Sequence, residues 1–114
     1  MHFIETTVFT RRLPAILSDE EYRLLQEDLN NRPDAGKEIK QSGGLRKIRW
    51  AAKGHGKRGG ARVIYYWIVS QDIIFFLYIY GKNEQGDLTS DQLKQLRKVV
   101  NEELKETYDE EGNV

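Results

Sequence analysis

Four basic side chains stand where neighbouring strands of one sheet can bring them together. Apolar and basic residues alternate over residues 45–50, so Lys47 and Arg49 point to the same face. Arg62 opens the next run of strand-forming residues, and Lys82 follows the last such run. Preorganised cations stabilise the negative charge that builds on a phosphorane when RNA is cleaved by its own 2′-hydroxyl. A lysine whose pKa is lowered by adjacent cations can also take the proton of that hydroxyl.

Few other kinds of catalytic site are compatible with the residues of this chain. There is no cysteine, which excludes a disulfide framework, a thiol nucleophile and a cysteine-ligated metal. The two histidines, His2 and His55, cannot form a histidine cluster. The sequence also contains no paired carboxylates, Ser/His/Asp set or phosphate-loop motif. We therefore expect a cationic site that uses neither a metal nor a cofactor.

The charges are strongly segregated, although 18 basic and 18 acidic residues balance over the whole chain. Residues 37–62 hold nine Lys and Arg against a single acid, Glu38. Such a segment is typical of a protein that binds a polyanion such as RNA. Lys53, Lys57 and Arg58 lie in a glycine-rich stretch, and we expect them to bind RNA phosphates by charge alone. The alternative is a loop that is merely solvated.

His55 lies in the same glycine-rich stretch, and it has two interpretations. An imidazole with an ordinary pKa near 6.5 is suited to proton transfer at neutral pH. The alternative is a solvated loop residue that takes no part in chemistry. The same alternative applies to Lys47, Arg49 and Arg62, which can form an ordinary solvated strand face.

The length of 114 residues predicts one domain, which we place at residues 1–108, followed by an acidic tail at 109–114. Neither a secretory signal nor an apolar stretch long enough to span a membrane is visible, so we expect a cytoplasmic protein without membrane contact. A capping box at Ser18 and Glu21 predicts a helix over residues 18–31, and a second box at Thr89 starts a C-terminal helix. Strands are expected at residues 2–9, 45–50, 61–69 and 73–80, with a helical or irregular turn at 10–17.

This order of elements predicts an α+β fold with an antiparallel sheet. The N-terminal helices and the C-terminal helix are expected to pack against one face of that sheet. The other face would then be left partly open for a ligand.

Three short motifs carry a family resemblance. LRKIR at residues 45–49, GARVIYY at 60–66 and YGKNE at 80–84 resemble the central strand motifs of RelE/ParE-superfamily toxins. The three motifs are most similar to the HigB-like, phage Gp49-like branch, and their order, their spacing and the insertion KGHGKRGG at residues 53–60 together make the match specific. The similarity spans nearly the whole chain and implies a small RelE-like fold.

The resemblance implies the toxin of a type II toxin–antitoxin system. Such a toxin is an endoribonuclease that cleaves mRNA in the ribosomal A site and so inhibits translation. Its implied partners are the ribosome, mRNA and a cognate HigA-like helix-turn-helix antitoxin, through which it meets operator DNA only indirectly.

The resemblance also implies roles for individual residues. Lys47 and Arg49 occupy the places of the paired basic residues in RelE, one of which is the proposed general base, and Arg62 that of the transition-state arginine. Asn83 stands where RelE has an arginine thought to support the leaving group, and near Thr89 RelE's stacking tyrosine is absent. For the acid role Lys82, Lys57 and His55 are candidates, and for the stacking role Tyr65 and Trp50.

The complete set of expected site residues has two parts. We expect the catalytic residues to be Lys47, Arg49, Arg62 and Lys82. We expect RNA or ribosome contacts from Lys53, His55, Lys57, Arg58 and Asn83. Two alternative functions stay open: a ParE-like inhibitor of DNA gyrase, and a non-catalytic module that only binds RNA.

Overall fold

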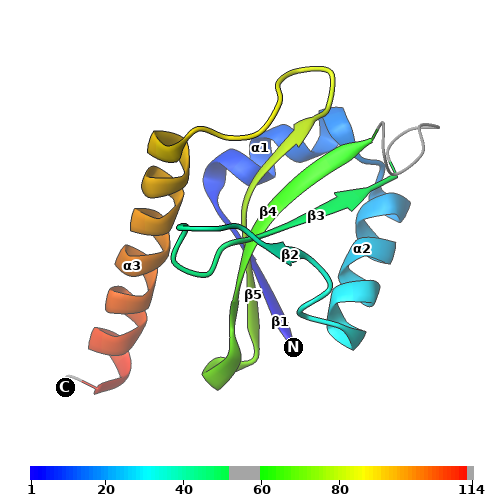
Figure 1. Cartoon of the computed structure of the whole chain (residues 1–114). Coiled ribbons are helices and arrows are strands. Elements are labelled where there is room, and N and C mark those ends of the chain that lie inside the picture. The colour runs from blue at the N-terminus through cyan, green and yellow to red at the C-terminus, as the bar shows by residue number, and fades with distance from the viewer. Residues whose placement is uncertain (52–59, 113–114) are drawn as a thin grey trace.

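A computed structural model of the chain describes residues 1–51 and 60–112, with side chains as far as residue 103. A 3-10 turn, Val69–Gln71, links the two longest strands. The other elements, in chain order, are β1 (His2–Glu5), α1 (Thr7–Ile16), α2 (Asp19–Asn31), β2 (Lys37–Glu38), β3 (Arg46–Trp50), β4 (Ala61–Ile68), β5 (Ile73–Gly81) and α3 (Ser90–Gly112) (Figure 1). None of the helices in the described part is long and apolar enough to cross a membrane.

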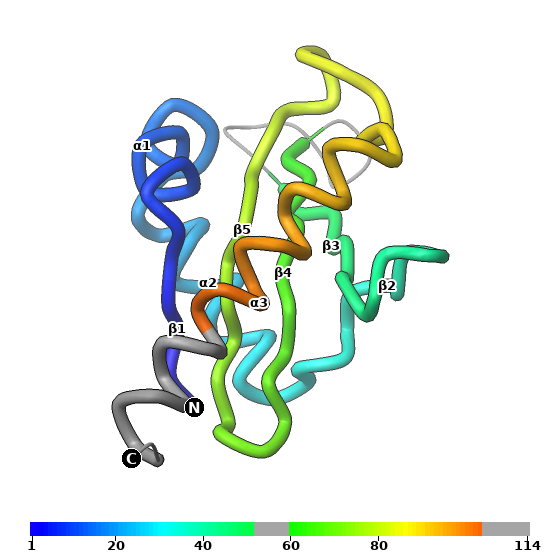
Figure 2. The backbone as a smooth tube through the Cα atoms, turned by 90° about the vertical axis from the view of Figure 1, so that its left-hand side faces the viewer, coloured from blue at the N-terminus to red at the C-terminus, as the bar shows by residue number. Residues whose placement is uncertain are grey.

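The five strands form one mixed sheet in the order β1-β5-β4-β3-β2 (Figure 2). The pairs β5-β4, β4-β3 and β3-β2 are antiparallel, as expected. The prediction of an entirely antiparallel sheet is wrong at one edge, because β1 lies parallel to β5. Parallel pairing requires a long crossover, and here α1, α2 and the strands that follow them separate β1 from β5 in the chain.

Helices lie on both faces of the sheet, so the prediction that all of them pack on one face is wrong, and the face under α3 is open only in part. Helices α1 and α2 pack on one face, and α3 crosses in front of the other (Figures 1 and 2). The reason is visible in β4, where residues 61–65 are all buried, which requires cover on both sides. The cluster under α1 and α2 is formed by Phe9, Leu17, Leu25, Leu29, Ile48, Ala61, Val63, Tyr65, Ile74, Phe76 and Ile79. The cluster under α3 is formed by Leu45, Ile64, Phe75, Leu77, Tyr80 and Val100.

The N-terminal strand is shorter than the predicted 2–9. It ends at Glu5 because the Thr6 side chain accepts a hydrogen bond from the Phe9 amide at 3.0 Å and so caps α1. The Thr6 hydroxyl also donates to the Leu77 carbonyl at 2.9 Å, which ties the start of α1 to β5. Helix α1 therefore takes the place of the end of the predicted strand, and it confirms the helical alternative for residues 10–17.

Both predicted capping boxes are present. Ser18 Oγ accepts from the Glu21 amide at 3.1 Å, and the Glu21 carboxylate accepts from the Ser18 amide at 2.7 Å. Thr89 and Gln92 exchange the equivalent pair of hydrogen bonds at the start of α3. Helix α3 continues to Gly112, so residues 109–112 of the expected acidic tail are helical.

A β-bulge in β5 decides which way its last residues face. Ile64 pairs with Tyr78, whereas its neighbour Tyr65 pairs with Phe76, so Leu77 is the extra residue. Leu77 and Tyr78 consequently both pack on the α3 side. Beyond the bulge, the residue paired with Arg62 is Tyr80.

Candidate active site

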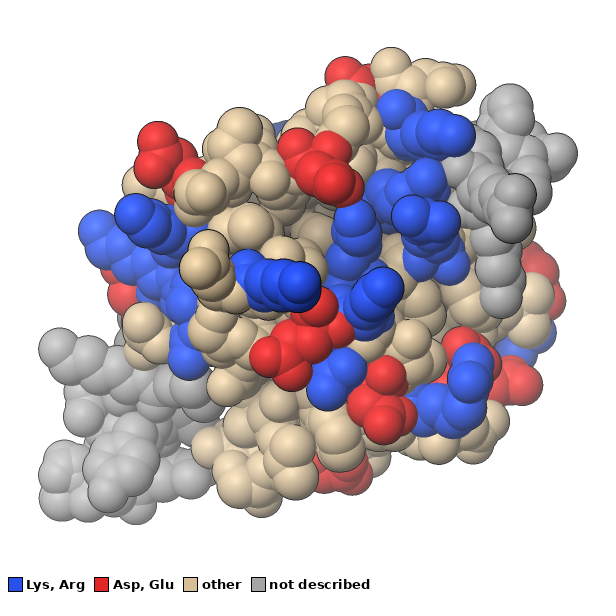
Figure 3. Space-filling model, viewed as in Figure 1, with Lys and Arg blue, Asp and Glu red and all other residues tan. Residues whose placement is uncertain are grey.

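Three of the predicted catalytic cations meet on the α3 side of the sheet. Arg49 pairs directly with Arg62, and Lys47 pairs with Ile64, so the side chains of these residues share one face. The intervening Ile48 packs under α1 and α2, which confirms the alternation predicted for residues 45–50. We call Lys47, Arg49 and Arg62 the cation cluster. It follows the apolar cluster under α3 along β3 and β4, and Lys and Arg side chains gather over this end of the face (upper right in Figure 3).

The members of the cation cluster differ in their access to solvent. Arg62 is only 8% exposed, the Lys47 side chain is 24% exposed, and Arg49 is exposed. A guanidinium enclosed to the extent of Arg62 is held in one place before any substrate arrives. The cluster therefore combines one largely buried cation, Arg62, with two, Lys47 and Arg49, that a polyanion can reach from solvent.

An acidic residue that the sequence analysis did not select lies in this cluster. Asp87 Oδ1 is 2.8 Å from Lys47 Nζ, and the Asp87 side chain is 86% exposed. The hydrogen bond and charge of Lys47 lower the pKa of Asp87, with smaller contributions from Arg49 and Arg62. The carboxylate thus senses all three cations. No local motif marks Asp87, because its partner Lys47 is 40 residues away in the chain.

Tyr80 lies next to the cation cluster, because it is the residue of β5 that pairs with Arg62. Its side chain is buried under α3, as expected for most aromatic residues of the strands. Burial raises the pKa of Tyr80, the Asp87 charge raises it further, and Arg62 and Arg49 act in the opposite direction. Tyr80 is therefore part of the buried apolar cluster that lies next to the charged groups.

The loop between β5 and α3 is fixed at two points. At the first, the Glu84 carboxylate accepts a hydrogen bond from the Gly81 amide at 2.8 Å and pairs with Arg12. These two interactions lower the pKa of Glu84. Arg12 also donates to the Ile79 carbonyl at 2.7 Å, so α1 holds this loop against the end of β5. The second point is the Thr89–Gln92 capping box at the start of α3, and between the two points Asp87 reaches Lys47.

The remaining predicted residues occupy different positions. Lys82 and Asn83 lie in the exposed turn after β5, where the Lys82 amide donates to the Gly60 carbonyl at 3.2 Å. The turn is therefore next to the start of β4, and a role for either side chain stays a prediction. The other four predicted RNA-binding residues lie outside the described part of the chain: Lys53, His55, Lys57 and Arg58.

The two candidates for a stacking surface are on the wrong face. Tyr65 is fully buried under α1 and α2, where its hydroxyl donates to the Pro33 carbonyl and accepts from the Gly36 amide. Trp50 packs against the same cluster, and its indole N–H donates to the Glu21 carbonyl at 3.0 Å. Both rings follow the strand alternation that sends their neighbours Arg49 and Ile64 to the other side. Neither ring stacks a base beside the cation cluster.

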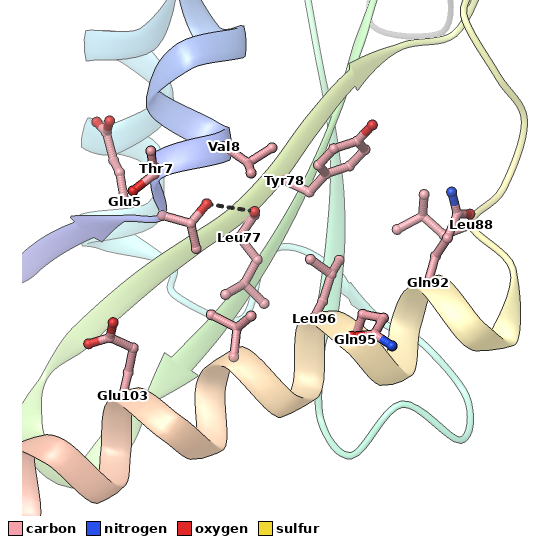
Figure 4. A pocket seen from close by; sticks show the side chains of 12 residues that line it. Glu5, Thr7, Val8, Leu77, Tyr78, Leu88, Gln92, Gln95, Leu96 and Glu103 are labelled. Carbon is pink, nitrogen blue, oxygen red and sulfur yellow. Dashed lines mark hydrogen bonds between the residues drawn. The ribbon is translucent and has the colours of Figure 1, made fainter.

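Two hollows lie on the α3 side of the sheet. The larger, about 540 Å3, is bounded by the start of α1, β5 and α3 (Figure 4). Apolar groups such as Val8, Leu77 and Leu96 line it, its charged groups are Glu5 and Glu103, and it therefore does not suit a phosphate. The smaller, about 260 Å3, adjoins the cation cluster. Its charged and aromatic lining is Lys37, Glu38, Lys47, Asp87 and Tyr80, above the apolar side chains Ile39, Ile64, Leu88 and Leu93.

A comparison with known families agrees with this geometry. Residues 9–111 match the family model described as the RelE toxin of the RelE/RelB toxin–antitoxin system. The match covers most of the chain, including most of α1, the cation cluster and nearly all of α3. Within the described residues, no three His, Asp or Glu side chains come together in a way that could hold a metal ion.

Proposed function

The chain belongs to the RelE toxin family, and from this premise we propose that it is a ribosome-dependent mRNA endonuclease that arrests translation. The observation that carries the proposal is the cation cluster, in which Arg49 lies directly opposite a largely buried Arg62. Two guanidiniums held in this way can donate to the non-bridging oxygens of one phosphate. Their charge is most strongly stabilising when a second negative charge develops on the phosphorane.

The proposed reaction is attack of a ribose 2′-hydroxyl on the adjacent phosphorus. A base removes the hydroxyl proton, the new O–P bond forms, and the bond to the 5′-oxygen breaks as that oxygen takes a proton from an acid, for which Lys82, Lys57 and His55 are the candidates. The products are a 2′,3′-cyclic phosphate and a free 5′-hydroxyl. Lys47 is at the site as a proton-transfer group, whereas Arg62 and Arg49 stabilise charge, so no metal is required in this scheme.

We further propose that the chain is a HigB-like toxin, neutralised by a HigA-like antitoxin that carries any contact with operator DNA. The support is the basic insertion at residues 53–60, which stands in the sequence between β3 and β4. Lys53, His55, Lys57 and Arg58 would add phosphate contacts to mRNA or ribosomal RNA, and Asn83 would contact the same RNA. Cleavage on ribosomes places this activity in the cytoplasm.

The test is an in vitro translation reaction in which mRNA 5′ ends are mapped by primer extension. Wild-type protein is expected to produce cuts only when ribosomes are present. Arg62→Ala is expected to lower the cleavage rate by about 10²- to 10³-fold, because it removes one preorganised donor to the developing charge. Arg23→Ala, which removes an exposed arginine from α2, is the matched control and should cleave like the wild type.

Folding of each variant is checked by circular dichroism and thermal unfolding. A folded Arg62→Ala protein that still cleaves at the wild-type rate would overturn the role of Arg62. Intact mRNA with folded wild-type protein would overturn the endonuclease itself. In that case inhibition of DNA supercoiling by gyrase would indicate a ParE-like toxin, and salt-sensitive RNA binding without cleavage would indicate a binding module.

A further inference from the structure

The loop between β5 and α3 places a carboxylate among the three cations that would bind RNA. Asp87 reaches Lys47 directly, at 2.8 Å, and its pKa is lowered by Lys47, Arg49 and Arg62 together. Asp87 is thus an internal anion of the cation cluster. The cluster carries three positive charges, and in the free protein one of them is already neutralised at short range.

A carboxylate and a phosphodiester present the same pattern to these donors. Each carries a single negative charge shared by two equivalent oxygens, and each accepts charge-assisted hydrogen bonds from Lys and Arg. A phosphate that contacts Lys47 beside Arg49 and Arg62 therefore needs the donors that Asp87 now uses. The two anions cannot occupy that position together, since like charges at such a separation repel.

The Asp87 contact is of a kind that exchanges easily. Asp87 is 86% exposed and its partner Lys47 is partly exposed, and ion pairs in such surroundings are weak because water competes for both groups. The loop does not depend on this contact for its position. Glu84 fixes it to Gly81 and Arg12 on one side, and the Thr89–Gln92 capping box fixes it to α3 on the other. The Asp87 side chain can leave Lys47 while the loop stays in place.

We propose that the Asp87 carboxylate occupies the position at which the cation cluster binds an RNA phosphate, and that RNA binding exchanges one anion for the other. The inference rests on the proposed function in one respect, namely that the cluster is where RNA binds. Asp87 then acts as an internal competitor. It weakens the binding of RNA that offers a single phosphate contact, and a substrate held in place by additional contacts displaces it.

The test is the affinity of Asp87→Asn for a short single-stranded RNA whose 2′-O-methyl groups prevent cleavage, measured without ribosomes at several salt concentrations. Asp87→Asn should bind about three- to fivefold more tightly than the wild type, because an exposed competing ion pair has been removed. When the logarithm of the association constant is plotted against the logarithm of the salt concentration, the slope for Asp87→Asn should be steeper by about 0.7 than that for the wild type. In the variant, the phosphate at this position is neutralised by the cluster and releases its counterion without having to replace the Asp87 carboxylate. Asp91→Asn, which removes the same charge from an exposed position four residues away, is the matched control.

Each result decides the question. Equal or weaker binding by Asp87→Asn, or an equal gain in Asp91→Asn, would overturn the inference. A loss of cleavage on ribosomes by Asp87→Asn with unchanged RNA affinity would also overturn it, and would make Asp87 a proton-transfer group instead. If wild-type protein cuts no mRNA in translation but Asp87→Asn still binds RNA more tightly and more salt-sensitively, the proposed endonuclease fails while this inference stands.

Discussion

The two faces of the sheet differ in what their side chains do. On the side of α1 and α2, aromatic and aliphatic side chains form one closed cluster, in which the rings of Phe9 and Phe76 stack with centroids 4.9 Å apart. On the side of α3, an apolar cluster covers only one end of β3 and β4. At the other end the same face carries Lys47, Arg49 and Arg62.

This difference teaches how a small protein separates folding from chemistry. Successive residues of a strand point to opposite faces, so Ile48 stabilises the fold between two candidate catalytic residues, Lys47 and Arg49. Val63, the residue after Arg62, likewise packs in the cluster under α1 and α2. We therefore expect changes on the α1/α2 face to alter stability with little effect on RNA chemistry, and changes to the cations to do the reverse.

The largest expected effect is on stability, and it comes from removing a large side chain from the buried cluster under α1 and α2. Phe76→Ala removes a fully buried ring that contacts Phe3, Phe9 and Tyr22, and should lower the free energy of unfolding by about 3–5 kcal/mol. Chemical denaturation measures this change. The control is Val69→Ala, an exposed apolar position at which a change within about 0.5 kcal/mol is expected. A loss below 1 kcal/mol for Phe76→Ala would break the comparison.

A smaller effect is expected from a single hydroxyl on the same face. Tyr65→Phe leaves the buried Gly36 amide without its acceptor at 2.8 Å and the Pro33 carbonyl without its donor at 2.7 Å. The expected destabilisation is about 1–3 kcal/mol, with unchanged cleavage by the folded protein. Tyr78→Phe, on the other face, is the matched control, because the contact that its hydroxyl makes within the described part of the chain is long, 3.5 Å to Gln85. Equal losses from the two variants would remove the distinction between the faces.

Local sequence signals predicted the elements whose stability is local. The capping box at Ser18 and Glu21 fixed the start of α2, and alternation assigned Lys47 and Arg49 to one face. Strands β4 and β5 were predicted because two runs of aromatic and β-branched residues flank a short break. The placement of Arg62 beside Arg49 followed from that alternation and from the order of the strands.

Features that depend on distant contacts were not predicted. The parallel pairing of β1 and the two-residue strand β2 arise from neighbours far along the chain, and neither leaves a pattern in its own residues. The cover on both faces follows from the packing of α3, not from any single helix. The place of Asp87 in the site was not predicted for the same reason, because Asp87 joins the cation cluster through an ion pair with Lys47, which is 40 residues earlier in the chain.

The smallest expected effect concerns the ionisation of Asp87 on the α3 side of the sheet, which is the more open of the two faces. Lys47 holds the pKa of Asp87 below the ordinary value of about 3.9, so Lys47→Met should raise it most of the way back, while Arg49 and Arg62 maintain a small depression. Carbon-13 NMR of the carboxyl group against pH measures this shift. The pKa of Glu84, lowered by the Gly81 amide and Arg12, should be the same in both proteins and serves as the internal control.

A lowered carboxyl pKa also fixes the sign of the effect on stability. The Asp87–Lys47 pair stabilises the folded protein at pH values above the unfolded-state pKa of Asp87, and this stabilisation is lost as the pH falls through the lower folded-state value. The difference in unfolding free energy between the wild type and Lys47→Met should therefore be small at neutral pH, because the pair is exposed, and should shrink further in acid. A wild-type Asp87 that titrates at its ordinary value would mean that the carboxylate does not stay among the cations. The open face would then carry three uncompensated charges, and its contrast with the closed face would be larger than the structure indicates.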